Sequence, residues 1–345
     1  MPAGDPRGPA PDAGLFAPLR ACWVCGGTQL ARFHELSFDF GAYREQDPEL
    51  FGYTGRTAWL VRCAACGFAQ PDVLPTLPNY FDRMYDQQWS AEWIEHEFHA
   101  AYKDFIFGRI LAALAHRRDG RTGRLLDIGA HAGRFMHLAQ HAGWDVEGIE
   151  LNPRTAECAA RRTGAPVHRV NAQTLGSRGH RYAAVTLTDV LEHIPHPVSL
   201  LTAAAGVLEP GGWIAVKVPC GTSQWWKEQT LAALVRGRRV SLADNLVHVN
   251  HFSPRALGRA LAAAGFTRVA VQTAPPELPP LEPHPLRAAA ACAVRLGIYA
   301  AGRLPGAVYT PLALHLQAYA QKPAAADAAA AGPRAHSESG RGAAA

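Results

Sequence analysis

The sequence predicts an α/β protein built on a mostly parallel β-sheet, and three observations support this fold class. Residues 124–153, RLLDIGAHAGRFMHLAQHAGWDVEGIELNP, contain an apolar run, a glycine turn, a helical repeat, a second apolar run and an acid near the end. Apolar runs and helical patterns then alternate as far as residue 219, which is typical of a parallel sheet that binds ligands at the carboxyl ends of its strands. The third observation is size, because 345 residues, of which 48% are hydrophobic, can form a large core.

The first of these elements form a βαβ unit. The run 125–128 suits a strand buried on both faces, residues 129–133 supply a glycine turn, and residues 135–142 repeat at helical spacing before Gly143. The second strand ends at Glu150. Such a turn brings backbone N–H groups to a helix N-terminus, and an acid on the next strand can accept the hydrogens of both ribose hydroxyls. The unit therefore predicts a site for a nucleoside-containing ligand.

The turn does not fit a dinucleotide. A pyrophosphate needs the glycines of the pattern G-x-G-x-x-G, but His131 and Arg134 occupy the corresponding positions after Gly129. An NAD site is therefore disfavoured. A nucleoside ligand without phosphates at this turn and an ordinary βαβ turn remain as alternatives.

Four of the seven cysteines form two C-x-x-C pairs, each followed by glycine, in CWVCGG and CAACG. Each pair places two thiolates on a tight turn, and two such turns supply the four sulfur ligands that tetrahedral zinc prefers. Four sulfur ligands leave no open coordination position, so we expect a structural zinc ion. Redox pairs and unrelated buried thiols are the alternatives. The predicted ligands are Cys22, Cys25, Cys63 and Cys66.

Composition divides the chain into five parts. The two ends are rich in Pro, Gly and Ala and are expected to be disordered, and a cysteine-bearing module and a helical connection or lid precede the α/β domain. The parts are 1–18 (disordered), 19–77 (zinc module), 78–122 (helical connection or lid), 123–322 (α/β domain) and 323–345 (disordered).

The connection is rich in aromatic residues. Five aromatics in residues 76–93 fit a lid over a ligand and an interface between the module and the α/β domain equally well. Residues 90–117 follow helical spacing and are expected to pack as one helix onto the sheet.

Further elements follow the βαβ unit in order. Helices are predicted at 154–163, 199–208 and 255–265, and strands at 167–170, 182–188, 213–219, 267–273 and 312–321. The Pro-rich link and helix 275–304 fit either a dimer surface or a substrate lid, so a homodimer is left open. Ser253 and Pro254 are expected to begin the helix as its N-cap and first residue.

Net charge and hydropathy limit the classes of partner that the protein is expected to bind. The net charge is +5 with no long Lys/Arg block, so no nucleic-acid partner is expected. The N-terminus has no apolar run of the kind found in signal peptides, and the apolar segment 288–301 is interrupted by Arg295 and too short for a bilayer span. We expect a cytoplasmic protein with no membrane partner.

Five segments carry a specific resemblance. DIGAHAGRF, Glu150, DVLEHIPHP, LEPGGWIAVKVP and HVNHFSPRALGRALAAAGF occur in an order and spacing that resemble a class I methyltransferase dependent on S-adenosylmethionine (SAM), over residues 125–273. The double C-x-x-C module resembles that of a branch which includes methyltransferases of sugars and secondary metabolites. The resemblance implies a Rossmann-like fold, with a mostly parallel seven-stranded sheet flanked by helices and a small N-terminal zinc module.

The resemblance also implies a cofactor site. The first turn would hold the methionine end of SAM, Glu150 its ribose, residues 171–172 its adenine, and residues 189–191 would lie beside the sulfonium. His131 replaces the middle glycine of the usual turn, which implies a changed loop. The implied cofactor-binding residues are Asp127, Gly129, Ala130, Gly133, Glu150, Leu151, Asn171, Ala172, Asp189 and Val190.

Methyl transfer to a hydroxyl requires alignment of the nucleophile and removal of its proton. Glu192 and His193 directly follow a strand that ends at the cofactor, so we expect catalytic roles for both, with His193 as the base and His196 as a weaker candidate. His248 lies in a second polar cluster and is the third catalytic candidate. A mononuclear metal held by Glu192, His193 and His248 is an alternative.

Two further segments have open roles. His251 either contacts the substrate or packs at the start of the helix that follows it. Trp225, Trp226 and Lys227, expected in a loop, form either a substrate wall or a packed aromatic pair.

The sequence therefore predicts a SAM-dependent methyltransferase acting on a small molecule, at a hydroxyl or carbon of a sugar or secondary-metabolite intermediate. The alternatives are an RNA base methyltransferase and a catalytically inactive interaction protein that binds SAM and zinc.

Overall fold

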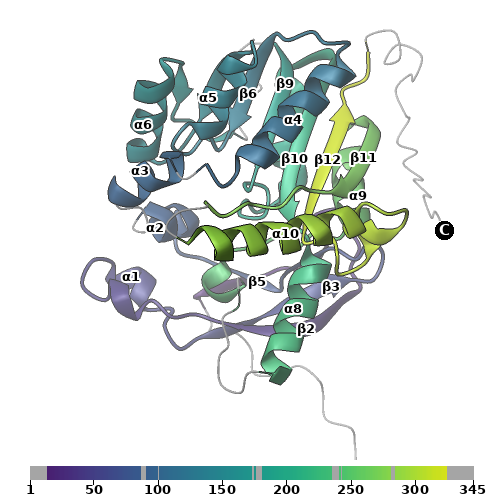
Figure 1. The fold of residues 1–345 in the computed structure, drawn as a ribbon. Helices are drawn as coiled ribbons and strands as arrows, with labels where there is room; N and C mark the ends of the chain where they lie inside the picture. Colours follow the sequence, from purple (N-terminus) through teal and green to yellow (C-terminus); the bar gives the residue numbers. More distant parts are fainter. Residues whose placement is uncertain are drawn as a thin grey trace, which may run out of the picture.

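The computed structural model describes residues 14–86, 91–99, 101–172, 175, 181–234, 241, 243–280 and 284–324. A large sheet with helices on both faces lies above a smaller β-rich module, and helix α10 runs between them (Figure 1). Within the described ranges, none of the helices has the length and apolarity needed to cross a membrane.

The central sheet has seven strands in the order β11-β12-β10-β9-β6-β7-β8. Neighbouring strands from β10 to β8 pair in parallel, whereas β12 is antiparallel to both β10 and β11. The expected mostly parallel seven-stranded sheet is thus confirmed. Its strands are β6 (Arg124–Ile128), β7 (Asp145–Ile149), β8 (Val167–His168), β9 (Tyr182–Thr188), β10 (Leu208–Pro219), β11 (Thr267–Thr273) and β12 (His315–Gln321).

Alternate residues of the strands point to opposite faces of the sheet, and each face has its own core. Leu125, Ala215 and Tyr319 pack with helices α4 (Asp104–Arg117) and α5 (Arg134–His141). On the other face, residues such as Leu126 and Val216 pack with α7 (Pro197–Val207) and α9 (Pro254–Ala263). Helix α6 (Pro153–Thr163) connects β7 to β8. The strand order reverses between β6 and β9, which is where an open α/β sheet leaves a crevice for ligands.

The N-terminal module contains a three-stranded sheet, β2-β3-β4, and a two-stranded ribbon, β1-β5. Its aromatic core also includes Trp225, Leu246 and Val249 from the second half of the chain, so the module packs against helix α8 (Gly221–Leu234) and the segment after it. Its elements are β1 (Phe16–Pro18), β2 (Leu30–Ser37), α1 (Pro48–Phe51), β3 (Thr57–Cys63), β4 (Ala69–Pro71) and β5 (Val73–Pro75).

Several expected elements differ from the structure. The helix expected over 90–117 is divided into α3 (Ala91–His99) and α4, after the short helix α2 (Tyr80–Asp86). The division has a backbone cause, because Ala101 has φ +52°, a left-handed conformation through which a right-handed helix cannot continue.

The expected ends of the chain are only partly described. Residues 1–13 and 325–345, expected to be disordered, lie outside the described residues, but Phe16–Pro18 of the same expected segment pair with β5 as strand β1. Trp225, Trp226 and Lys227 belong to α8, so the expectation of a loop was wrong. The last strand begins at His315 instead of residue 312.

Candidate functional site

A cavity of about 1130 Å³ opens at the carboxyl ends of β6, β7 and β9. Its walls include nine of the ten residues expected to bind the cofactor. The exception is Gly133, which begins α5 at φ +87° and faces α6 instead. A Cβ atom at Gly133 would lie 2.9 Å from Ala159 Cα, so this glycine allows close helix packing. The nine are Asp127, Gly129, Ala130, Glu150, Leu151, Asn171, Ala172, Asp189 and Val190.

Gly129 keeps two walls of the cavity close together. It has φ +79°, and a Cβ atom there would lie 2.3 Å from Val190 Cγ2. A side chain at this position would therefore push the turn after β6 away from the turn after β9. The glycine is required for the shape of the cavity.

His131, which stands where the usual turn has glycine, has a left-handed backbone conformation. Its φ is +48°, in the left-handed region that His enters more readily than most residues. Burial, reinforced by the charge of Lys103, lowers the pKa of His131 to about 4, so the ring is neutral at pH 7. The loop thus follows the left-handed path at the cost of some backbone strain.

Glu150 links the loop after β6 to the loop after β7 at the wall of the cavity. Its Oε2 accepts a hydrogen bond from His131 N at 2.9 Å, and its Oε1 accepts one from Asn152 N at 2.9 Å. Burial raises the pKa of Glu150. Each carboxylate oxygen has a second lone pair, so the group can accept ribose hydroxyls while it holds the loops.

Asp127 stands at the end of β6, where burial raises its pKa to about 7. Its Oδ1 accepts a hydrogen bond from Thr186 Oγ1 at 2.7 Å, which fixes the direction of the carboxyl group. The geometry places an oriented, buried carboxyl at the wall of the cavity beside Gly129.

Asp189 is held by two lysines that the sequence analysis did not single out. Lys217 Nζ lies 2.5 Å from Asp189 Oδ1, and Lys103 Nζ lies 3.1 Å from Asp189 Oδ2. Burial alone would raise the pKa of Asp189, but the charges of Lys217 and Lys103 hold it below its ordinary value. Lys217 interrupts the apolar strand WIAVKVP, which is the signal that identifies it in the sequence, whereas Lys103 has no such signal.

Glu192, His193 and His248 lie together, as the sequence analysis expected. One ligand-type atom from each side chain falls within 4.8 Å of the others. The rings of His193 and His248 are 4.8 Å apart, and His193 Nε2 is 4.0 Å from Glu192 Oε1. His193 lines the cavity, whereas the other two stand behind it.

The protonation of this cluster follows from burial. Burial lowers the pKa values of His193 and His248, the latter to about 2, so both rings are neutral at pH 7. His193 Nδ1 lies 2.7 Å from Val247 O and must donate to it, because a carbonyl only accepts. Its Nε2 is therefore the nitrogen that can accept a proton. Burial and the charge of Asp189 raise the pKa of Glu192 to about 8.

Asn250 fixes the turn that carries Glu192 and His193. Its Nδ2 donates to Leu191 O and Ile194 O, each at 2.7 Å, and its backbone N donates to Glu192 O at 3.0 Å. Asn250 lies two residues after His248 in the sequence, where it was assigned no site role. The structure shows it to be a positioning residue.

The remaining polar candidates, His251, Ser253 and His196, make packing or capping contacts. His251 is buried, with Nε2 3.1 Å from His248 O and its ring 4.8 Å from Trp225, which supports the packing alternative for both. Ser253 Oγ accepts from Ala256 N at 3.2 Å and caps α9, as expected. His196 also lines the cavity, with its ring 5.0 Å from Trp23.

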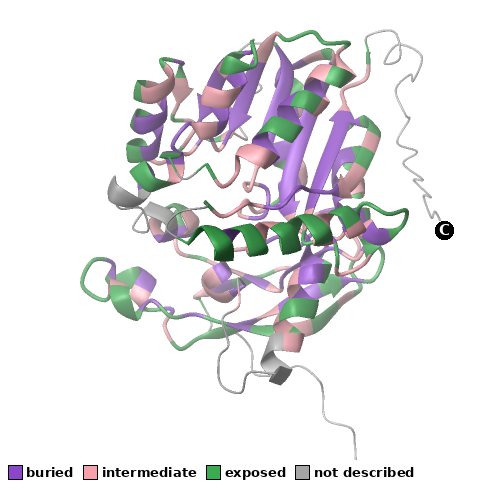
Figure 2. Ribbon diagram, viewed as in Figure 1, coloured by how far each residue is buried: buried purple, intermediate pink, exposed green. Residues whose placement is uncertain are grey.

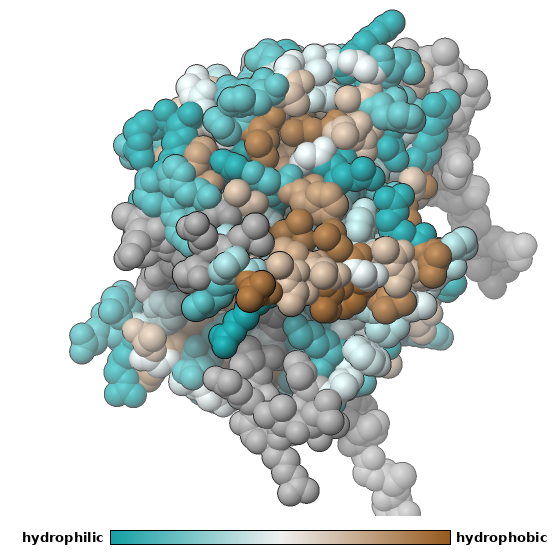
Figure 3. Space-filling model, in the orientation of Figure 1, coloured by the Kyte–Doolittle hydropathy of each residue, from teal (hydrophilic) through white to brown (hydrophobic). Residues whose placement is uncertain are grey.

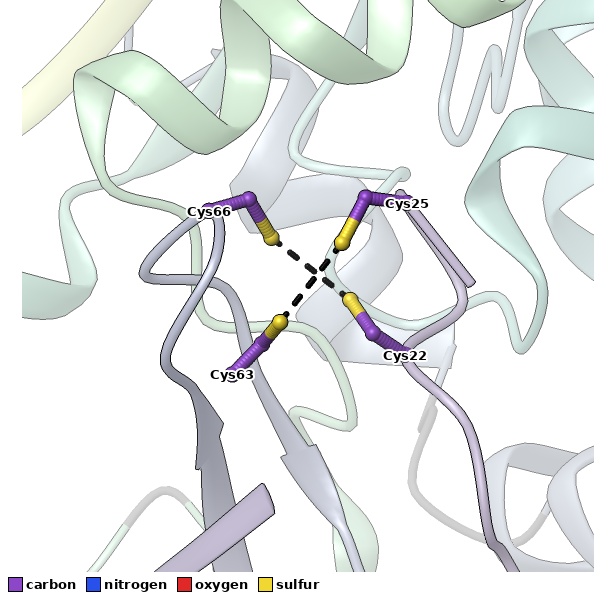
Figure 4. A group of neighbouring side chains, drawn as sticks. All are labelled: Cys22, Cys25, Cys63 and Cys66. Carbon is purple, nitrogen blue, oxygen red and sulfur yellow. Dashed lines mark hydrogen bonds between the residues drawn. The ribbon is translucent and has the colours of Figure 1, made fainter. Parts of the chain in front are cut away.

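The four cysteines of the two C-x-x-C pairs converge on one point (Figure 4). The Sγ atoms of Cys22 and Cys66 are 3.6 Å apart, and those of Cys25 and Cys63 are 3.5 Å apart. Both turns have the same form: the N–H of the glycine after the pair, Gly26 or Gly67, donates to the first cysteine's carbonyl at 2.9 Å.

These distances fit a tetrahedral sulfur site. Zn–S bonds of about 2.3 Å place sulfur atoms about 3.8 Å apart in a tetrahedron, whereas a disulfide needs about 2.05 Å. Burial raises the pKa of Cys66 and raises that of Cys22 to about 11, so these thiols keep their protons unless a cation is present. The donor set therefore suits zinc.

A family model described as "Methyltransferase domain" matches residues 95–271. This range contains the walls of the cavity from β6 to the start of β11 and excludes the cysteine module.

Curated relatives match a shorter part of the chain than the family model does. The ubiquinone biosynthesis O-methyltransferase of Bordetella avium is 32% identical over 111 residues, covering 29% of this chain and 44% of the relative. That of Photorhabdus laumondii is 29% identical over 153 residues, covering 41% and 62%. The chain thus spans roughly half the length of these two relatives.

Solved structures give more distant matches. Phosphoethanolamine N-methyltransferase 2 of Haemonchus contortus, in complex with SAM, has a TM-score of 0.46 at 17% identity, covering 74% of this chain and 63% of that one. The plantazolicin methyltransferase BpumL, in complex with S-adenosylhomocysteine, has a TM-score of 0.45 at 15% identity, covering 71% and 96%.

Proposed function

Since the chain belongs to the methyltransferase-domain family, we propose that it transfers a methyl group from SAM to a small-molecule acceptor. The acceptor atom is a hydroxyl oxygen or a carbon of a sugar or of a secondary-metabolite intermediate. One observation carries this proposal: a single cavity is lined by Glu150, Asp127, Asp189 and His193. The names of the curated relatives, which are O-methyltransferases, favour a hydroxyl.

The cavity's own residues would hold the cofactor. Glu150 is placed to accept the ribose hydroxyls, Asp127 to take the amino group of the methionine end, and residues 171–172 to flank the adenine. When bound, SAM supplies an electrophilic methyl group on its sulfonium. Asp189 keeps its negative charge at the wall of the same cavity because two lysines stabilise it.

His193 is proposed as the base. Its Nδ1 is held by Val247 O, so Nε2 takes the proton of the acceptor hydroxyl as the oxygen attacks. Burial keeps the ring neutral before the reaction. Glu192 and His248 complete the site by fixing the position and surroundings of His193. A mononuclear metal held by Glu192, His193 and His248 is the alternative use of the same three side chains.

The test of this function is a transfer assay. Purified protein is incubated with SAM and a panel of hydroxylated sugars, phenols and enolisable carbonyl compounds, and release of S-adenosylhomocysteine is measured. We expect release with at least one acceptor, and a loss of about 100-fold or more in kcat for His193→Ala with unchanged SAM affinity. If the wild-type protein binds SAM but releases no S-adenosylhomocysteine with any acceptor, the inactive interaction protein becomes the better account. Full activity in the variant would remove His193 as the base.

We also propose that Cys22, Cys25, Cys63 and Cys66 hold one structural zinc ion. The converging sulfur atoms support this zinc site, and the position of the cysteine cluster suggests its structural role. Arg259 Nη1 of α9 donates to Ala65 O at 2.8 Å, inside the second cysteine turn. The zinc site would therefore fasten the N-terminal module to the methyltransferase domain.

A further inference from the structure

Helix α10 (Pro285–Gly302) buries very few of its residues. Within this fully described helix of 18 residues, Ala288 and Gly302 alone are buried. The 10-residue helix α9, by contrast, buries five residues. Figure 2 shows α10 as a mostly exposed ribbon across the front of the molecule.

The exposed face of α10 and the chain after it is apolar. Figure 3 shows hydrophobic residues gathered along this helix. Nine large hydrophobic side chains are exposed in the described part of the protein, and seven of them fall between residues 286 and 314. A concentration of this kind on one element marks an interaction surface. The seven are Leu286, Val294, Leu296, Leu304, Tyr309, Leu312 and Leu314.

The segment that carries these apolar side chains has positively charged residues and no acidic residue. The sequence from residue 284 to residue 324 contains no Asp or Glu. Three exposed arginines, Arg287, Arg295 and Arg303, are spaced eight residues apart along α10 and its C-cap. The segment therefore combines exposed apolar side chains with a purely cationic set of charges.

The helix is held in place without a partner. Thr273 Oγ1 donates to Gly302 O at 2.5 Å, and Arg295 Nη1 donates to Glu277 O at 2.7 Å. The link before the helix also reaches the cavity, because Leu278 N donates to Tyr102 O at 2.9 Å and Tyr102 lines the cavity. The link that precedes α10 thus lies beside the proposed active site.

We propose that α10 lies on the surface of an anionic lipid bilayer, with its apolar side chains among the acyl chains and its arginines at the headgroups. Surface-lying helices combine these two features, and they need neither the length nor the uniform apolarity of a span. The expectation of no membrane partner rested on the absence of a signal-type apolar run and of a spanning segment, and a helix that lies on a bilayer surface needs neither. This inference goes beyond the proposed function and does not depend on it.

A second copy of the chain is the competing occupant. In a two-fold dimer the same surface meets itself, so the arginines of the two copies would share one interface. The segment from residue 284 to residue 324 contains no Asp or Glu that could form ion pairs with these arginines. Anionic headgroups supply the missing negative charge, and this complementarity favours the lipid.

The test is flotation of the full-length protein with vesicles of phosphatidylcholine alone and of phosphatidylcholine with 30% phosphatidylglycerol. We expect binding to the anionic vesicles that weakens as salt rises, and little binding to phosphatidylcholine. The double variant R287Q/R295Q should bind the anionic vesicles about 30-fold more weakly, at roughly 1 kcal/mol for each arginine at a charged surface. The variant L286S/V294S should also lose binding.

Two comparisons make the test decisive. The matched variant R255Q/R268Q removes two exposed arginines elsewhere and should bind like the wild type. The proposal is overturned if R255Q/R268Q loses as much vesicle binding as R287Q/R295Q. It is also overturned if the wild type binds neutral vesicles as well as anionic ones, or binds neither. A dimer in sedimentation analysis that L286S/V294S abolishes, in a protein that ignores vesicles, would assign the surface to a second copy.

Discussion

The ammonium group of Lys217 lies 2.5 Å from the carboxylate of Asp189, and its side chain is 1% exposed. A charged lysine inside a sheet is stable only when a partner and hydrogen bonds replace water. Asp189 is that partner, and it also lines the cavity. The pair therefore links the stability of the sheet to the charge at the proposed methyl-transfer site.

Replacement of Lys217 by Met should destabilise the protein. The change leaves Asp189 with Lys103 as its remaining cation, so we expect a loss of about 3 kcal/mol in the free energy of unfolding. Unfolding by urea measures this loss in the free energy of unfolding. The double variant K217M/D189N removes both charges and should recover part of the loss. If K217M alone is as stable as the wild type, the pair has no structural importance.

Replacement of Glu150 by Ala should weaken SAM binding by about 100-fold, because an ionised acceptor of hydrogen bonds contributes roughly 1.5–3 kcal/mol per bond. The loss combines missing ribose contacts with release of the loops at His131 and Asn152. Isothermal titration calorimetry measures the affinity. Glu157→Ala, which removes an exposed carboxylate from α6, is the control and should bind normally. Unchanged affinity in E150A would remove Glu150 from the site.

The βαβ unit could be predicted because its information is local. Apolar periodicity, glycine turns and the acid at Glu150 all lie within 30 residues, and the structure places them as strand, turn, helix and strand. Lys103 and Asn250 could not be assigned in this way. Each acts through a partner about 60 to 85 residues away in sequence, and only the folded sheet brings those partners together.

Two errors have the same origin. The spacing of apolar residues over 90–117 is helical on both sides of Ala101, and periodicity does not register a single left-handed residue. Trp225 was expected in a loop because the sequence does not show that the module's aromatic core would cover it. In both cases the local pattern of apolar residues did not reveal the structure.

Glu192 by itself should lower the free energy of unfolding as pH rises from 5 to 8, whereas buried neutral histidines such as His131 and His248 contribute in the opposite direction because their pKa values are lowered. The pKa of Glu192 is near 4.3 in an unfolded chain and about 8 in the protein. A raised pKa stabilises the fold below the unfolded value, and this contribution is lost as pH rises through the folded value. We expect Glu192 to contribute a decrease of roughly 3–4 kcal/mol in the free energy of unfolding over this range.

The variant Glu192→Gln isolates this effect, since glutamine resembles the protonated carboxyl and does not titrate. Urea unfolding at pH 5 and pH 8 gives the change in the free energy of unfolding for each protein, and this change should be more positive for E192Q than for the wild type. The same change in both proteins would show that Glu192 does not titrate in this range.

One zinc ion per chain should be found by elemental analysis of protein grown in zinc-supplemented medium. Cys66→Ser should lose that zinc and about 3 kcal/mol of stability, because the four ligands join the two cysteine turns and the turns hold the module. Cys292→Ser is the control, since Cys292 lies on α10 and should affect neither quantity. Zinc-free wild-type protein with normal stability would contradict the metal site.

The turn at His131 should tolerate glycine better than alanine. Both replacements remove the imidazole, and they differ only in the Cβ atom at φ +48°. Alanine is normally the more stable of the two in a folded chain, but in the left-handed region its Cβ costs about 1–2 kcal/mol. We therefore expect H131G to exceed H131A by about 1 kcal/mol in the free energy of unfolding, measured with urea. Both variants keep the backbone N–H that bonds Glu150, so SAM affinity should follow the same order. If H131A is as stable as H131G, the left-handed conformation is not a constraint at this position, and another cause must explain the departure from glycine.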